Sequence, residues 1–134
     1  MQHQIKLLAL LILLSTSTLK AQSCTGYVTY SQGAWGACAN GNNIGNYLNT
    51  HFSLAFPNGL QIGCTNTLLL TSANAVRNFL PQSTTPKALP SGNLIDPNSN
   101  TYKNILAGQL VSLALNIQFD IYDSNFAQIG RAHV

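Results

Sequence analysis

The sequence has little charge and no glutamate. Charged residues make up 7% of its 134 residues, whereas ordinary soluble domains contain about 25%. A nucleic-acid-binding surface needs many lysines and arginines to neutralise phosphates, and a disordered charged tail also needs a high charge density. The composition therefore excludes both classes. Its three acidic residues also provide too little material for a carboxylate metal cage or a relay of acid and base groups.

Cysteine is scarce as well, since the chain contains only Cys24, Cys38 and Cys64. An odd number leaves at least one thiol without a partner in the same chain. A bridge between Cys24 and Cys38 would stabilise the fold by about 3 kcal/mol in the chain-entropy model, with Cys64 then a buried free thiol. The alternative is three buried, unbridged cysteines. Neither a Cys-x-x-Cys motif nor a neighbouring histidine pair is present, so we predict no metal site and no cofactor.

The one long apolar run lies near the N-terminus, at Leu7–Leu14. Eight residues span about 12 Å as a helix, whereas the hydrocarbon core of a bilayer is about 30 Å thick. The run is followed by a polar stretch and the small residue Ala21. Residues 1–21 are therefore typical of a secretory signal that is cleaved before Gln22. Lipid attachment at Cys24 is the alternative, although Ala21 replaces the bulky aliphatic residue expected at such a site.

Residues 22–134 then form a single secreted domain with no stable membrane span after cleavage. Its net charge is +1, from four basic and three acidic side chains: Arg77, Lys87, Lys103, Arg131, Asp96, Asp120 and Asp123. Asparagine, serine, threonine and glutamine supply the polarity that charge usually supplies. This composition favours an extracellular domain whose solubility does not depend on charge.

Hydrophobic periodicity predicts a strand and a helix in the first third of that domain. Residues 25–30 alternate as in a strand, and a glycine-rich loop over 33–43 follows. Apolar residues at helical spacing over 44–55 predict a helix, for which Asn43 is the expected N-cap.

The middle of the chain predicts a hairpin and a short helix. The apolar runs 60–64 and 67–71 are typical of two antiparallel strands. Ser72 is placed to cap a helix over 73–80, which a proline then stops. The proline-rich residues 81–101 are expected to form a long surface loop.

The last predicted element is the longest helix, from 102 to about 117, capped by Thr101 or Asn100. It is apolar nearly all round, which is typical of a buried helix. We expect an extended tail over 119–129. The predicted fold is thus a small α+β domain with short antiparallel strands packed on a central apolar helix.

Several spaced motifs resemble an uncharacterised domain of secreted and cell-surface proteins of the Bacteroidetes. They are Tyr30-Ser-Gln-Gly-Ala-Trp-Gly36, Gly41-Asn-Asn-Ile-Gly-Asn-Tyr-Leu48, Phe56-Pro-Asn-Gly-Leu-Gln-Ile-Gly63, Leu70-Thr-Ser-Ala73, Phe79-Leu-Pro81 and Leu106-Ala-Gly-Gln-Leu-Val-Ser-Leu-Ala-Leu-Asn116. The resemblance implies a cell-surface or adhesion-associated role, and it carries no catalytic residues. It also implies further segments after the long helix, so we expect the domain to be incomplete at its C-terminus.

The candidates for acid and base chemistry are few. His51 falls on the apolar side of the first helix, where it would act as a general base only with a nucleophile and an orienting carboxylate beside it. A packed histidine is the alternative. Asp120 and Asp123 could pair as in a glycosidase, but their spacing of three near a helix end favours structural roles. We therefore assign no catalytic residue.

One stretch resembles the start of a calcium-binding loop. Residues Asp96-Pro-Asn98-Ser-Asn100 carry oxygen ligands at alternate positions. However, Thr101 stands where such a loop needs glycine, and Ala107 stands where it needs glutamate. A turn that leads into the long helix is the prediction.

Aromatic and amide side chains gather around the glycine-rich loop. Tyr30 and Trp35 flank it, and Asn40, Asn42 and Asn43 lie within it or at its end. Exposed rings stack on sugar faces while amides bind hydroxyl groups, so these five residues are the candidate ligand-binding set. The alternative for Trp35 is a core position beneath the loop, with its indole N–H bound to a carbonyl.

The sequence therefore predicts a secreted, non-catalytic module of a cell-surface or adhesion-associated protein, with glycans or surface proteins as partners. A carbohydrate-binding module that uses Tyr30 and Trp35 is the alternative. A small secreted hydrolase that uses His51 is a third hypothesis.

Signal cleavage can be tested directly. The full chain, expressed in a Gram-negative host and recovered from the exported fraction, is expected to begin at Gln22 when its intact mass is measured. A mass that retains residues 1–21 would contradict the signal, and a mass increased by a diacylglyceryl group would assign Cys24 to lipid attachment.

Overall fold

The structure, a computed structural model, describes residues 28–126. This part of the chain forms four helices and one small sheet of three strands. In chain order the elements are α2 (Gln32–Trp35), α3 (Ile44–Ala55), β1 (Leu60–Gly63), β2 (Thr67–Leu70), α4 (Ala73–Phe79), β3 (Asn93–Ile95) and α5 (Ile105–Tyr122). The predicted α+β class is confirmed, with α5 packed against the sheet.

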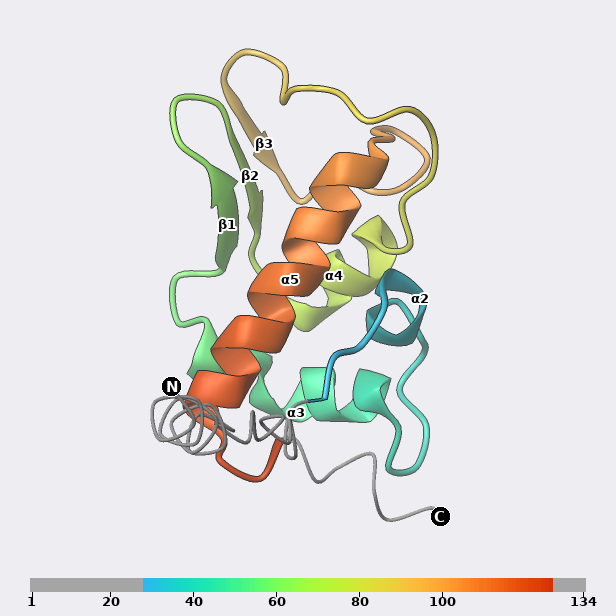
Figure 1. Cartoon of the computed structure of the whole chain (residues 1–134), viewed down its shortest axis with the longest axis vertical. Helices are drawn as coiled ribbons and strands as arrows, with labels where there is room; N and C mark the ends of the chain where they lie inside the picture. Colours follow the sequence, from blue (N-terminus) through green and yellow to red (C-terminus); the bar gives the residue numbers. More distant parts are fainter. Residues whose placement is uncertain (1–27, 127–134) are drawn as a thin grey trace, which may run out of the picture.

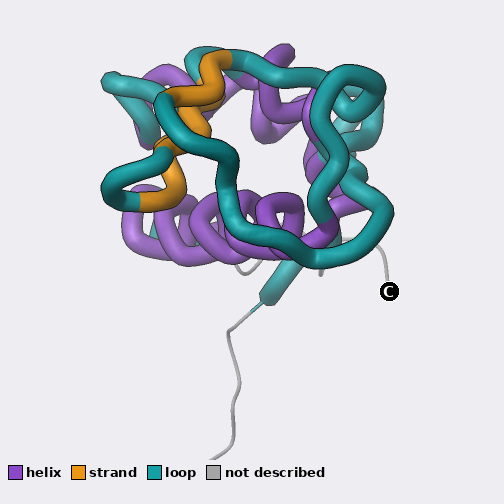
Figure 2. The backbone as a smooth tube through the Cα atoms, turned by 90° about the horizontal axis from the view of Figure 1, so that it is seen from above, coloured by secondary structure: helices purple, strands orange, loops and turns teal. Residues whose placement is uncertain are grey.

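Figure 1 shows α5 running the length of the molecule, with the sheet on one side and α2 and α4 on the other. The helix α3 crosses behind the C-terminal half of α5. Viewed from above, α5 lies along one outer side of the backbone (Figure 2). One face of α5 therefore packs on the rest of the domain, and the opposite face points outward.

Local capping signals place α3 and α4 where the sequence predicts them. The Asn43 side chain accepts a hydrogen bond from the Asn46 N–H at 2.9 Å at the start of α3. The Ser72 hydroxyl oxygen accepts one from the Ala75 N–H at 3.1 Å at the start of α4. Each bond satisfies one of the amide groups that a helix start leaves without an intrahelical partner.

The predicted hairpin is confirmed, but the sheet is mixed. The strands β1 and β2 are antiparallel, with Leu60 opposite Leu70. The third strand, β3, pairs parallel to β2 within the predicted surface loop. This strand was not predicted because Asn93 and Ile95 are exposed, so its three residues lack the buried apolar pattern of a strand. The Thr67 hydroxyl donates to the Asn93 side chain at 2.8 Å and helps to hold β3 beside β2.

The N-terminal strand prediction is wrong for the residues that the structure describes. Val28–Tyr30 form no strand, and residues 25–27 lie outside the described range. Instead, the side chain of Asn116 on α5 bonds both backbone groups of Tyr30, accepting from its N–H at 2.8 Å and donating to its carbonyl at 2.9 Å. An asparagine side chain here supplies the pair of hydrogen bonds that a neighbouring strand would have provided.

The glycine-rich loop also contains an element that the sequence did not predict. Ser31 caps the short helix α2, which ends at Trp35. The Trp35 side chain has no exposed surface and lies against Phe119 and Phe126, with ring centroids 5.4 and 6.0 Å away. The aromatic cluster between α2, α3 and the end of α5 thus anchors the glycine-rich segment to the core.

The long helix lies further along the chain than predicted. It begins after Asn104 rather than after Thr101 or Asn100, and it continues to Tyr122. The predicted extended tail is wrong over 119–122, which are helical, whereas residues 127–129 lie outside the described range. The helix starts later than predicted because the Asn104 side chain, rather than Thr101 or Asn100, accepts hydrogen bonds from the first backbone N–H groups of the helix.

The expectation that this helix is buried on all sides is also wrong. Val111, Leu115 and Phe119 are fully buried on one face. On the opposite face five aliphatic side chains are 43–72% exposed: Leu106, Leu110, Leu113, Ile117 and Ile121. The sequence could not separate these two faces, because both carry the same kind of residue.

Three buried amide side chains tie the start of α5 to the rest of the fold. The Gln32 side chain accepts from the Gln82 N–H at 2.8 Å, and the Gln82 side chain accepts from the Asn104 N–H at 2.8 Å. Asn104, which is fully buried, donates to the Lys87 carbonyl at 2.8 Å. Gly108 lies where a Cβ atom would collide with the Gln32 side chain, so the close packing of these amides requires glycine at that position.

We expect Asn104→Ala to destabilise the protein by about 2–4 kcal/mol, because it removes the helix cap and leaves buried backbone groups without partners. The free energy of unfolding in urea measures this loss. Asn100→Ala is the matched control, since Asn100 is exposed and its replacement should change stability by less than about 0.5 kcal/mol. Equal stability of the two variants would contradict the anchoring role of Asn104.

Candidate functional site

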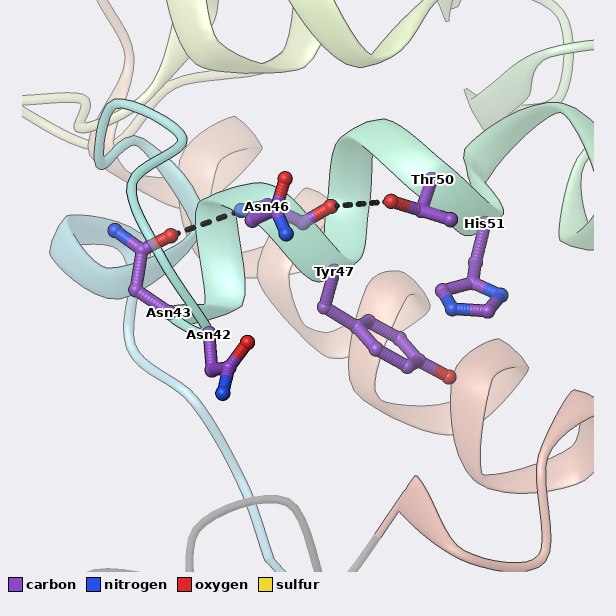
Figure 3. A pocket seen from close by; sticks show the side chains of 6 residues that line it. All are labelled: Asn42, Asn43, Asn46, Tyr47, Thr50 and His51. Atoms are coloured by element: carbon purple, nitrogen blue, oxygen red, sulfur yellow. Dashed lines mark hydrogen bonds between the residues drawn. The ribbon is translucent and has the colours of Figure 1, made fainter.

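A polar hollow lies along α3 and the turn before it. Its cavity volume is about 370 Å³, and its lining consists of Asn42, Asn43, Asn46, Tyr47, Thr50 and His51. Figure 3 shows these side chains along one side of the helix, with the Tyr47 ring between Asn42 and His51. The hollow therefore combines three neutral amides, the hydroxyl groups of Thr50 and Tyr47, and two aromatic rings, of which the Tyr47 ring is mostly buried.

Helix geometry explains why these residues meet. Positions 43, 46, 47, 50 and 51 are spaced by three and four residues and so share one face of α3. Asn42 stands immediately before the cap and reaches the same side. The opposite face of α3, which includes Leu48, Phe52 and Ala55, is buried in the core. The amphipathic helix thus presents a polar face at a fixed position.

Asn43 builds the hollow but has little capacity left to bind a ligand. Its side-chain oxygen accepts from the backbone N–H groups of Asn40 at 3.1 Å and Asn46 at 2.9 Å. Its side-chain nitrogen donates to the Cys38 carbonyl at 2.7 Å. Asn43 therefore fixes the turn before α3, and the Asn40 side chain does not line the hollow.

Asn42 and Asn46 are the side chains best placed to contact a ligand. Both are exposed, and the bonds that the described residues form at these positions involve the Asn46 backbone rather than a side-chain amide. The Thr50 hydroxyl donates to the Asn46 carbonyl at 3.0 Å, which leaves its oxygen available as an acceptor. Each amide has an NH₂ group that donates and a carbonyl oxygen that accepts. The pair can therefore bind a ligand hydroxyl group either as its donor or as its acceptor.

The aromatic end of the hollow is built by Tyr47 and His51. Their ring centroids are 4.3 Å apart. The Tyr47 hydroxyl donates to the Asp123 carboxylate at 3.0 Å. Burial raises the pKa of Tyr47 well above its ordinary value, and the hydrogen bond and the negative charge of Asp123 raise it further. Tyr47 therefore stays a neutral hydrogen-bond donor, which links α3 to the end of α5.

Within residues 28–126, the structure does not bring a hydrogen-bonding nucleophile or carboxylate to His51 Nδ1, which the hydrolase hypothesis needs. That atom is buried and has no hydrogen-bond partner among the described residues. Asp123 accepts hydrogen bonds from the Tyr47 hydroxyl and the Asn125 N–H instead. Asp120 is exposed and lines a different hollow. The orienting carboxylate of a triad is thus engaged elsewhere, and the two aspartates have separate surroundings.

The predicted sugar-stacking pair does not form an exposed platform. Trp35 is fully buried, which corrects its assignment to the ligand-binding set and matches the core position that was the alternative. Its indole Nε1 has no partner in the described part of the chain, so the expected bond to a carbonyl is absent there. Tyr30 is half-buried and meets Trp35 edge to face, with centroids 5.6 Å apart, and burial raises its pKa.

The calcium-like stretch forms a turn, as predicted. The Asp96 carboxylate accepts from the Thr71 N–H at 2.7 Å and from the Thr71 hydroxyl at 2.6 Å. The Asn98 side chain accepts from the backbone N–H groups of Asn100 and Thr101. The Asp96 bonds hold the loop against Thr71 after the end of β2, and the Asn98 bonds close the turn. Residues 28–126 hold no group of three histidine, cysteine or acidic side chains arranged for a metal.

The cysteines differ from the expectation. Cys38 and Cys64 are both exposed and form no disulfide within residues 28–126, whereas Cys64 was predicted to be buried. Cys64 follows β1 at the hairpin turn, where the sheet no longer covers it. Cys24 lies outside the described residues, so the predicted bridge to Cys38 stays a prediction.

No known protein family, curated protein or solved structure matches the chain. The resemblance to a domain of Bacteroidetes surface proteins therefore stays a prediction. Of the predicted binding residues, Asn42 and Asn43 line the hollow, whereas Asn46, Tyr47 and Thr50 were not predicted to do so. Their spacing of three and four residues along a helix with a clear cap was the signal that could have placed them beside Asn43.

The raised pKa of Tyr47 predicts a loss of stability in alkaline solution. Its folded pKa lies above the value of about 10 in the unfolded chain, so its contribution to stability is complete below pH 10 and declines as the pH rises further. Tyr47→Phe should flatten the fall of the urea midpoint above pH 10 and cost about 1 kcal/mol at neutral pH, through loss of the bond to Asp123.

Tyr122→Phe is the control for this experiment, because it removes an exposed hydroxyl group near the end of α5. It should follow the unsubstituted protein closely, because Tyr122 contributes to the raised pKa of Tyr47 less than burial and Asp123 do. An alkaline transition that Tyr47→Phe leaves unchanged would show that Tyr47 does not contribute to it. Part of the transition should remain in that variant, since the pKa of Tyr30 is raised as well.

Proposed function

We propose that this protein is a non-catalytic binding module of a secreted or cell-surface protein, and that it binds a neutral glycan in the hollow on α3. The observation that carries the proposal is a pair of exposed amides, Asn42 and Asn46, whose side chains bond to no other described residue and lie beside the rings of Tyr47 and His51. The alternative predicted from the sequence, a carbohydrate-binding module, is thus retained at a different set of residues.

The chemistry of the lining supports a neutral, polyhydroxylated ligand. Amides have no titratable proton at ordinary pH, so they bind through hydrogen bonds and do not transfer protons as a general acid or base does. Sugar hydroxyl groups both donate and accept, which matches the paired donor and acceptor groups of Asn42 and Asn46. Among residues 28–126, no lysine, arginine or acidic side chain lines the hollow, so its described lining does not favour a charged ligand.

The composition of the whole chain supports the same role. A signal-like N-terminus and a surface that relies on amides rather than charge fit an exported module in contact with glycans or surface proteins. The resemblance to Bacteroidetes surface proteins supports an adhesion-associated setting. Both features come from the sequence alone, and the hollow on α3 is the site that we propose for the contact.

A glycan array tests the proposal. The exported, fluorescently labelled chain should bind a subset of neutral glycans, and titration calorimetry with the best glycan should give its affinity. Asn42→Ala and Asn46→Ala should each weaken that affinity about fivefold, because each loses about one hydrogen bond of roughly 1 kcal/mol.

Asn100→Ala serves as the matched control, because it removes an exposed asparagine that does not line the hollow. It should bind like the unsubstituted chain. If the unsubstituted chain retained no glycan, the proposed ligand class would be wrong. If binding survived both substitutions in the hollow without loss, the ligand would bind at another surface.

A further inference from the structure

The outward face of α5 carries a continuous apolar stripe. Its five members are Leu106, Leu110, Leu113, Ile117 and Ile121, which are 44, 43, 53, 52 and 72% exposed. Their spacing of four, three, four and four residues keeps them on one face along nearly the whole helix. At these exposures they leave roughly 500 Å² of apolar surface, in the upper part of the range for the largest such patch on a monomer.

Shallow hollows flank the stripe at both of its ends. Near the N-terminus of α5, Leu106 and Leu110 share a hollow of about 100 Å³ with Ile62, Lys87 and Leu89. Near the C-terminus, the last three residues of the stripe line a hollow of about 250 Å³ together with Val28, Thr29, Asn116 and Asp120. The stripe and the two hollows together are called the groove below, and the hollows can receive side chains from a partner.

The walls of the second hollow are held in place. Asn116 binds both backbone groups of Tyr30, and this fixes the chain beside Val28 and Thr29 next to the stripe. A preformed wall lowers the entropy that is lost when a partner binds. The groove is thus ready for an occupant without rearrangement of these residues.

We propose that the occupant is a second copy of this chain, whose α5 packs antiparallel to the first around a two-fold axis near Leu113. The spacing of the stripe is nearly symmetric about that residue. An antiparallel pair sets Leu106 against the partner's Ile121 and Leu110 against the partner's Ile117, while the two copies of Leu113 meet at the axis. Self-complementarity of this kind is what a two-fold interface requires.

Charge complementarity favours the antiparallel arrangement. Lys87 lines the hollow at the N-terminal end of the stripe, and Asp120 lines the hollow at the C-terminal end. Antiparallel packing places each Lys87 near the partner's Asp120, so that two opposite-charge pairs flank the apolar centre. It also sets the two helix dipoles in opposite directions. Parallel packing would bring like charges together instead.

The size of the stripe fits a modest dimer. Two such stripes bury about 1,000 Å² of apolar surface, and the flanking residues add a polar rim, which approaches the lower end of the range for specific interfaces. The glycan hollow on α3 shares no lining residue with the stripe or with its two flanking hollows, so dimerisation goes beyond the proposed function and does not depend on it. A dimer would carry two hollows and could bind a repeating glycan with avidity.

A lipid bilayer is the competing occupant. Among the described helices, α5 alone is long and apolar enough to cross a membrane by length and composition, with 33% of that stretch buried inside the fold. Its inner face, however, holds Phe119 and Val111 fully buried against the core, and Asp120 borders the stripe. These features favour a protein partner, and vesicle binding is included as an outcome below.

Sedimentation velocity of the exported full chain, measured over a wide range of concentrations, tests the dimer. The unsubstituted chain should show a reversible monomer–dimer equilibrium. Leu113→Lys places two like charges at the axis and should weaken dimerisation by about tenfold or more. Leu54→Lys is the matched control, because Leu54 is 64% exposed on α3 outside the stripe, and it should leave the equilibrium unchanged. Circular dichroism of both variants confirms that they fold.

Charge exchange gives a second test that folding defects cannot imitate. Lys87→Asp and Asp120→Lys should each weaken the dimer, and the double variant should restore it, because both opposite-charge pairs are then rebuilt with reversed sign. An unsubstituted chain that stays monomeric at every concentration would overturn the proposal, as would equal dimerisation of Leu113→Lys. Binding of a monomeric chain to neutral phosphatidylcholine vesicles would assign the stripe to lipid and likewise overturn it.

Discussion

The rest of the structure depends on the hydrogen bonds of one fully buried asparagine. Asn104 caps α5, and its amide also binds the backbone at Lys87, while Gln82 joins it to Gln32 of α2. A buried amide without partners costs more than its bonds gain, so this position allows few alternatives. The network fixes where the longest helix starts and thereby sets which of its residues face the core.

Because its start is fixed, α5 positions two surfaces, the hollow on α3 and the apolar stripe on its own outer face. On its inner face, Phe119 belongs to the aromatic cluster between α2, α3 and α5, and Asp123 at its end accepts a hydrogen bond from the Tyr47 hydroxyl. This positions the polar hollow on α3. Its outer face presents the apolar stripe. A shift of α5 by one residue would turn each face by about 100°, so both surfaces depend on the same anchor.

Parts of the fold and of the hollow could be predicted because their causes are local. Asn43 and Ser72 cap helices through bonds to residues three positions ahead, and the hairpin of β1 and β2 follows from two adjacent apolar runs. The start of α5 and the strand β3 were not predicted correctly, and for Trp35 the sequence left a core position and an exposed ring as alternatives. Their positions depend on partners distant in sequence, such as Phe119 for Trp35 and Thr67 for Asn93, and periodicity carries no information about such pairs.

The sequence by itself determined the α+β class, the cap of α3, the scarcity of charge and the amide-rich character of the surface, because composition and local hydrogen bonding suffice for each. Only the tertiary structure decided that Trp35 is buried, that Asn42 and Asn46 share a hollow with His51, and that α5 has an exposed apolar face. The physical reason is that burial depends on the packing of distant segments. An apolar residue has the same chemistry on either face of a helix, and only its neighbours distinguish core from surface.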